Sequence, residues 1–312
     1  MGHRRPPLTF TVRPVPPFRL DFTVWALRRR ARNAIDRWDG DTYRRIIVVG
    51  GRSTELAARQ AGSTTAPRLI ATATPAPRTS SGRELVTSTL DRLLGLRLDL
   101  SEWYRVAARD PRLRPLAERF RGVKAPRFPT AFEALVNAFA CQQLSLEVGL
   151  ELLNRLARLA ASQRGAEPDT QFAFPRPSDV ARLAPARCQA IGFSRQKVRA
   201  LLALARAIEA REVDLTSLAD EDDSGACARL LDLRGVGRWT AEYVLLRGLG
   251  RLHVFPGDDV GAQKRLALWL GRPGPLDYAG VRKAVARWQP YAGLVYFHLL
   301  LDGLSRKGAM DS

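Results

Sequence analysis

The spacing of apolar residues through the second half of the chain limits the folds that this chain can adopt. From Thr130 onward, apolar residues recur three and four positions apart, as one face of an α-helix requires. Thr130 and Glu133 form a capping box that starts the first helix. Asp277 is placed to cap a later helix, and Pro290 begins the last one. This half of the chain is therefore predicted to be helical throughout.

The first 125 residues show a different pattern. Strand-like runs occupy residues 8–12, 45–49 and 68–73, and helix-like segments occupy residues 25–32 and 82–95. Turn signals rich in proline or glycine, such as Gly50-Gly51, bound the strand-like runs. We therefore predict an N-terminal α+β domain over residues 1–125 and an all-helical region over residues 126–312.

The composition favours a globular protein with an anionic partner. The chain has 312 residues, of which 46% are hydrophobic, enough for two packed domains. Its 50 basic residues exceed its 31 acidic residues, for a net charge of +19. Most of the basic residues are arginines, whose planar fork of donors suits phosphate. An arginine-rich genome would also raise the charge, so the charge supports a nucleic-acid partner without proving it.

The cysteines and the apolar runs argue against several other classes of protein. Cys141, Cys188 and Cys227 are widely spaced and have no metal-ligand pattern, and three cysteines are too few for a four-cysteine iron–sulfur cluster. We predict reduced thiols. No apolar run reaches the ~18 residues of a membrane span. Arg4 and Arg5 are followed by no apolar segment, so we predict no signal peptide and a cytoplasmic location.

Residues 230–241 predict a short helix, a tight turn and a second helix. Gly235 and Gly237 allow positive φ angles and let another backbone come close. The backbone N–H groups at the start of the second helix would suit a DNA phosphate. A plain turn between helices, with no ligand, is the alternative. The carbonyl oxygens that would hold a monovalent cation, Na⁺ or K⁺, in this turn are those of Leu231, Leu233 and Val236.

The residues after this turn carry a family resemblance. The order Gly-Val-Gly-Arg-Trp-Thr-Ala at 235–241, with Asp259 twenty residues after Trp239, resembles the helix-hairpin-helix DNA glycosylase superfamily. Within it, the chain is most similar to the bacterial 3-methyladenine DNA glycosylase II family. Other matching segments are residues 141–145, 172–175, 192–199 and 287–291. The resemblance covers most of the chain. It implies a mainly α fold, with an α+β domain like the TATA-binding protein before the helical glycosylase region.

The resemblance makes Asp259 the catalytic residue. Its carboxylate would stabilise the oxocarbenium-like sugar and orient the attacking water. Such help suffices for an alkylated purine, which is cationic and leaves readily. Asp258 is expected to cap the following helix, and a capping role alone is the alternative for Asp259. Bifunctional relatives carry a Schiff-base lysine where this chain has Trp239, so we expect no strand cleavage.

Aromatic residues are the candidates for the base pocket. Trp239 and Tyr243 lie four positions apart, on one helix face, and match two of the family's pocket aromatics. Such rings would stack on a cationic base, although plain core packing is the alternative. Val260 and Leu300 stand where the closest relatives often carry aromatic residues. A narrower preference is therefore left open, such as 3-methyladenine, hypoxanthine or 1-methyladenine.

The resemblance also implies how the chain would hold DNA. Either Gln143 or Leu144 would fill the gap left by the flipped base, and a polar turn at a helix end is the alternative. The other candidates for DNA contact are Gly235, Val236, Gly237, Arg238, Thr240, Ser194, Lys197 and Lys264.

Together these features predict a monofunctional DNA glycosylase of base excision repair, acting on double-stranded DNA. We expect a monomer near the bacterial nucleoid that needs no cofactor for catalysis. Two alternatives stay open: a related glycosylase for hypoxanthine or an oxidised base, and a DNA-binding protein without catalysis.

Overall fold

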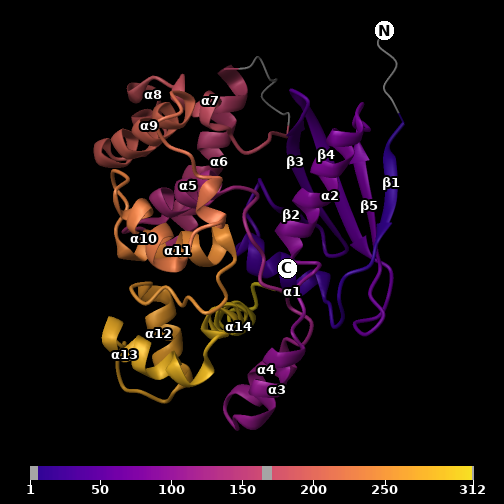
Figure 1. Ribbon diagram of the computed structural model, residues 1–312, viewed down its shortest axis with the longest axis vertical. Helices are drawn as coiled ribbons and strands as arrows, with labels where there is room; N and C mark the ends of the chain where they lie inside the picture. The colour runs from indigo at the N-terminus through magenta and orange to yellow at the C-terminus, as the bar shows by residue number, and fades with distance from the viewer. Residues whose placement is uncertain (1–5, 164–170, 311–312) are drawn as a thin grey trace. The chain divides into compact units, whose positions relative to one another are not determined.

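The computed structural model describes residues 6–163 and 171–310, so Arg4 and Arg5 lie outside the described residues. The chain divides into two compact units (Figure 1). The first unit comprises Met1–Ala31, Asp36–Arg127 and Leu252–Ser312, and the second comprises Arg32–Ile35 and Phe128–Arg251. Each unit is described by itself below.

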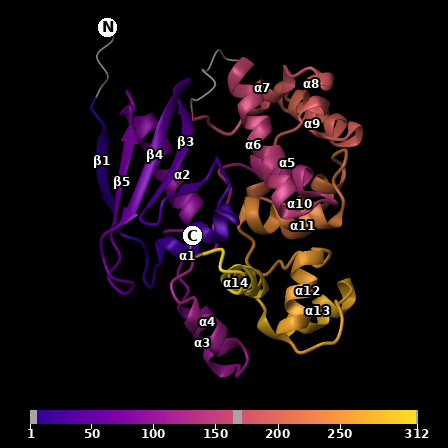
Figure 2. The same cartoon turned by 180° about the vertical axis from the view of Figure 1, so that it is seen from behind.

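The first unit contains an antiparallel sheet with the strand order β1-β5-β4-β3-β2. Figure 2 shows four of these strands in the order β1, β5, β4 and β3. Helix α2 packs against β3, and α1 packs against α2. The elements of its N-terminal part are β1 (Leu8–Val12), α1 (Leu20–Arg28), β2 (Arg37–Trp38), β3 (Thr42–Val49), β4 (Arg52–Gln60), β5 (Leu69–Thr74), α2 (Ser80–Leu94), α3 (Ser101–Arg109) and α4 (Leu113–Arg119).

The three predicted strands are confirmed, and the structure adds two more. Gly50 and Gly51 both have positive φ, 54° and 77°, and form the two-residue turn that joins β3 to β4. Strand β4 was not predicted, because its buried positions are small or polar apart from Leu56. Its pairing with β3 and β5 supplies the stability that its local sequence lacks. Strand β2 has only two residues, too few for a pattern.

The C-terminal helices group with the N-terminal part, which differs from the predicted division after residue 125. These elements are α12 (Val260–Trp269), α13 (Tyr278–Val285), the 3₁₀ turn η3 (Ala286–Trp288) and α14 (Ala292–Ser305). Helix α14 packs against α1 and α4. The indole Nε1 of Trp288 donates to Asp110 at 2.7 Å, and Arg119 pairs with Asp302 at 2.7 Å. These contacts join residues more than 170 positions apart, so local sequence patterns could not reveal them.

The second unit is helical throughout its described residues. Its elements are α5 (Ala131–Cys141), α6 (Leu146–Gln163), α7 (Pro177–Ala181), α8 (Pro185–Ala190), α9 (Arg195–Glu209), η1 (Ser217–Ala219), α10 (Asp223–Leu231), α11 (Arg238–Val244) and the π-helical turn η2 (Leu245–Leu249). Helix α5 is almost completely buried and packs against α6, α9 and α11. It therefore forms the centre of this unit, and the α10–turn–α11 hairpin packs on it.

The prediction of a mainly α fold with an N-terminal α+β part is confirmed. No helix within residues 6–163 and 171–310 is long and apolar enough to span a bilayer.

Candidate active site

Asp259 begins helix α12 in the first unit. Its Oδ1 accepts a hydrogen bond from the backbone N–H of Ala262 at 2.7 Å, which makes Asp259 the N-cap. The prediction that Asp258 is the cap is therefore wrong. The cause is a helix start one residue later than expected, because a capping oxygen must reach the N–H three residues on. The capping role considered for Asp259 is real, and it occupies only one of its two carboxylate oxygens.

The second oxygen of Asp259 is held from helix α14. The hydroxyl of Tyr296 donates to Oδ2 at 3.1 Å. Tyr296 is buried, and its ring packs edge-on against Phe255 at 5.5 Å between centroids. A donor on each oxygen fixes the orientation of the carboxylate, while Asp259 itself stays partly exposed. Tyr296 was not predicted from the sequence, because it lies in the apolar run of α14 and resembles a core residue.

Val260 and Leu300 have opposite environments in the first unit. Val260 directly follows Asp259 and is 61% exposed. Leu300 is buried on α14, one helical turn beyond Tyr296. Val260 thus presents an apolar surface beside the carboxylate, and Leu300 packs inside the unit. Lys264 is exposed on the same helix as Val260.

The turn of the hairpin in the second unit contains two glycines with different roles. Gly235 has a φ of +81°, and a Cβ on it would lie 2.7 Å from the Cβ of Ala200 on α9. Gly237 has a φ of −109°, and a Cβ on it would meet nothing within 4 Å. Gly237 is also the N-cap of α11 and supplies no side-chain cap. The turn is thus packed tightly at Gly235 and open at Gly237, where the first N–H groups of α11 begin.

Trp239 and Tyr243 stack on each other along α11. Their ring centroids are 5.4 Å apart with the planes tilted by 35°. Tyr243 is buried, and its ring centroid lies 6.3 Å from that of Phe128. Trp239 is half-buried. The buried guanidinium of Arg247 lies over both Phe128 and Tyr243, at 5.1 and 5.8 Å. Trp239 therefore keeps part of its ring exposed to solvent, and the buried ring of Tyr243 packs against it.

The loop between α5 and α6 presents both wedge candidates outward. Gln143 is exposed and has a φ of 54°, and Leu144 is 43% exposed. Gln142, which the sequence did not single out, ties the loop to the hairpin. Its side-chain Nε2 donates to the carbonyl of Gly235 and to Oγ1 of Thr240, both at 2.9 Å. Thr240 is buried, so its hydroxyl serves this contact.

Lys197 holds the same loop from helix α9. Its Nζ donates to the carbonyl of Gln142 at 2.7 Å and to that of Ala140 at 3.1 Å. Burial lowers the pKa of this ammonium. The ammonium thus satisfies carbonyls at the C-terminal end of α5, which differs from the predicted contact with phosphate. Ser194 caps α9 through its Oγ and is exposed, and Arg238 is exposed at the start of α11.

The carbonyls predicted to hold a cation have the right chemistry for Na⁺ or K⁺. The carbonyl of Leu233 accepts one hydrogen bond, from the N–H of Val236 at 3.1 Å, and a carbonyl oxygen has a second lone pair. The Gly235 carbonyl is engaged by Gln142. Among the described residues, no group of three or more histidine, cysteine or acidic side chains is placed to hold a metal ion. The cation at the hairpin stays a prediction.

The helical unit and its glycine-containing turn define a helix-hairpin-helix protein. Residues 136–290 match the family model described as HhH-GPD superfamily base excision DNA repair protein, and the chain belongs to this superfamily. It is 28% identical over 221 residues to a DNA-3-methyladenine glycosylase of Bacillus subtilis, covering 70% of this chain and 73% of the relative. It is 31% identical over 178 residues to DNA-3-methyladenine glycosylase 2 of Escherichia coli, covering 57% and 60%.

A solved structure shows the same fold. The 3-methyladenine DNA-glycosylase from Archaeoglobus fulgidus matches with a TM-score of 0.80 at 23% identity, over 96% of this chain and 98% of that one.

Proposed function

We propose that this protein is a monofunctional DNA glycosylase of base excision repair, which removes alkylated purines from double-stranded DNA. The observation that carries the proposal is the carboxylate of Asp259, held by the N–H of Ala262 and the hydroxyl of Tyr296. Capping of α12 needs only the Oδ1 of Asp259, whereas a pure DNA-binding protein would gain no affinity for an anionic duplex from a second oxygen held by Tyr296. The names of the curated relatives support the choice of alkylated bases.

The proposed reaction breaks one bond and forms another. The damaged nucleotide flips out of the duplex at a cost of a few kcal/mol. The bond between C1′ and the base nitrogen breaks, and its electron pair leaves with the base. A base made cationic by alkylation becomes neutral in this step and needs no general acid. Water then adds at C1′ and loses a proton, which leaves an abasic site.

Asp259 would act on the sugar cation formed between these steps. A carboxylate about 4 Å from a unit positive charge, at an effective dielectric of about 20, contributes about 4 kcal/mol. That energy corresponds to roughly a thousandfold in rate. Trp239 would stack on the flipped base through its exposed surface, and its face favours a cation.

The hairpin would hold the DNA during this reaction. A phosphate would approach the open side of the turn at Gly237, with a monovalent cation at the carbonyls of Leu231, Leu233 and Val236 assisting. Gln143 or Leu144 would fill the gap in the duplex. We propose a monomer as the active form, with no cofactor required for catalysis.

Base release from defined duplexes tests the proposed function. We expect release of 3-methyladenine or 7-methylguanine and no strand cleavage, because Trp239 has no amine to form a Schiff base. The assay uses duplexes with single lesions, including hypoxanthine and 8-oxoguanine, analysed with and without alkali. Borohydride trapping tests for a covalent enzyme–DNA adduct. Release of the oxidised base alone, or a trapped adduct, would contradict the proposal.

Removing the hydroxyl of Tyr296 tests its positioning role. We expect Tyr296→Phe to lower kcat for base release by roughly ten- to a hundredfold with KM nearly unchanged, because a hydrogen bond to a charged group contributes about 1.5–3 kcal/mol. Single-turnover and steady-state kinetics on one methylated duplex separate the two parameters. Tyr291→Phe, on a tyrosine that contacts the Trp103 ring instead, is the matched control. Equal kinetics for the two variants would remove Tyr296 from the mechanism.

A further inference from the structure

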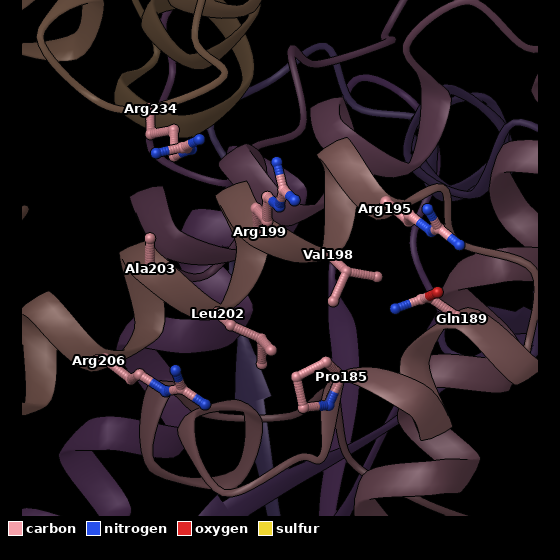
Figure 3. Close-up of a pocket in the computed structure, with 9 residues that line it drawn as sticks. All are labelled: Pro185, Gln189, Arg195, Val198, Arg199, Leu202, Ala203, Arg206 and Arg234. Carbon is pink, nitrogen blue, oxygen red and sulfur yellow. The ribbon is translucent and has the colours of Figure 1, made fainter.

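A groove of about 500 Å³ lies on the second unit, between α8, α9 and the residue before the hairpin glycines (Figure 3). Its floor is apolar and is formed by Val198, Leu202, Ala203 and Pro185. Four guanidinium groups stand around this floor, from Arg195, Arg199, Arg206 and Arg234, together with the amide of Gln189. The groove therefore combines a concentrated positive charge with an apolar base.

The arrangement of these arginines follows from the helix period. Arg195, Arg199 and Arg206 are four and seven residues apart, which places them on one face of α9 over about 16 Å. Arg234 joins them from the turn, next to Gly235, which packs against Ala200. The fold thus holds the groove directly beside the hairpin.

The positive charge of the groove is not balanced from within. No carboxylate lines it, and across residues 6–163 and 171–310 the structure pairs none of its four arginines with an acidic side chain. The contact of Arg206 with a protein group is a long one, 3.5 Å from its Nε to the carbonyl of Ala181. Four like charges this close repel one another, so an anion that binds among them would relieve the repulsion. The groove therefore has the charge of an anion site.

We propose that this groove holds backbone phosphates of DNA that runs on from the hairpin. This inference rests on the proposed function, which brings a phosphate to the turn beside Arg234. Arginine forks suit phosphate oxygens, and the apolar floor suits the carbon face of deoxyribose. An acidic protein segment would meet the same charge, but it would have no reason to lie beside the hairpin. Nothing predicted from the sequence assigned these four arginines.

The salt dependence of DNA binding tests the groove. Each phosphate that the protein neutralises adds about 0.9 to the slope of log K against log salt concentration. We expect the double variants Arg199→Ala/Arg234→Ala and Arg195→Ala/Arg206→Ala each to reduce this slope by about 1 to 2. The probe is an undamaged duplex of about 25 base pairs, titrated by fluorescence anisotropy at several salt concentrations, so the measurement does not depend on excision.

A matched control separates the groove from general charge. Arg182→Ala/Arg187→Ala removes the same charge from exposed arginines of the same unit that do not line the groove, and its slope should equal that of the wild type. Equal slopes for groove and control variants would overturn the proposal. If the wild type releases no base while the slopes still differ, the proposed function fails and the groove stands.

Discussion

Replacing Asp259 by asparagine should lower the single-turnover rate of base release about a thousandfold, because the amide carries no charge to stabilise the sugar cation. Asparagine caps helices as well as aspartate does, so α12 should still form and the thermal unfolding midpoint should change little. DNA affinity should be retained or rise, since one negative charge is removed. The measurement is base release from a methylated duplex with enzyme in excess.

Asp258→Asn is the matched control for this prediction. It removes the same charge one residue away, from a side chain that does not cap α12. We expect it to excise at a rate near that of the wild type. Excision by Asp259→Asn at the rate of this control would assign the catalytic role to another residue.

The second large effect is expected at Gly235, where alanine should destabilise the second unit by about 2–4 kcal/mol. A left-handed backbone costs a residue with a Cβ about 1–2 kcal/mol, and overpacking against a neighbour adds a similar amount. Here the added Cβ would lie 2.7 Å from that of Ala200. The thermal midpoint should fall by roughly 5–10 °C. DNA affinity should fall as well, because the turn that presents the α11 N–H groups is displaced.

Gly237→Ala provides the comparison within the same turn. Its backbone is in an ordinary region and its added methyl would meet nothing within 4 Å of the protein. We expect the unfolding midpoint to stay within about 1–2 °C of the wild type. A phosphate at this position would meet the methyl, so DNA affinity should fall without a loss of stability. Equal stability of the two glycine variants would show that the turn is not packed as described.

Local patterns in the sequence predicted what depends on local interactions. The helices of the second unit follow from apolar spacing and from caps such as Thr130 and Ser194, both of which accept the expected backbone hydrogen bonds. The hairpin follows from its glycines in the same way. Strand β4 and the grouping of α14 with the N-terminal helices were not predicted, because both depend on partners far away in the chain.

The sequence predicted which residue would be catalytic, but it did not predict the contacts that hold the residues of the candidate site in place. A family resemblance gave Asp259, but only the packing of α14 on α12 brings Tyr296 to its second oxygen. Lys197 is a charged residue near a helix start, and this position in the sequence predicts a contact with DNA at the surface. In the structure its long side chain reaches back to the carbonyls that end α5. Side chains that satisfy the ends of other helices leave no local pattern.

The hydrogen bonds of Gln142 have a consequence for how the enzyme would leave its product. The side chain of Gln142 joins the loop of Gln143 and Leu144 to the hairpin at Gly235 and Thr240. In the proposed reaction, the loop fills the duplex while the hairpin grips the backbone. Withdrawal of the loop alone would break both hydrogen bonds, so we expect the loop and the hairpin to leave the abasic DNA together. The dissociation rate of the product complex would then depend on the DNA contacts of the loop and of the hairpin together. The protein would cover the abasic site until both sets of contacts are broken.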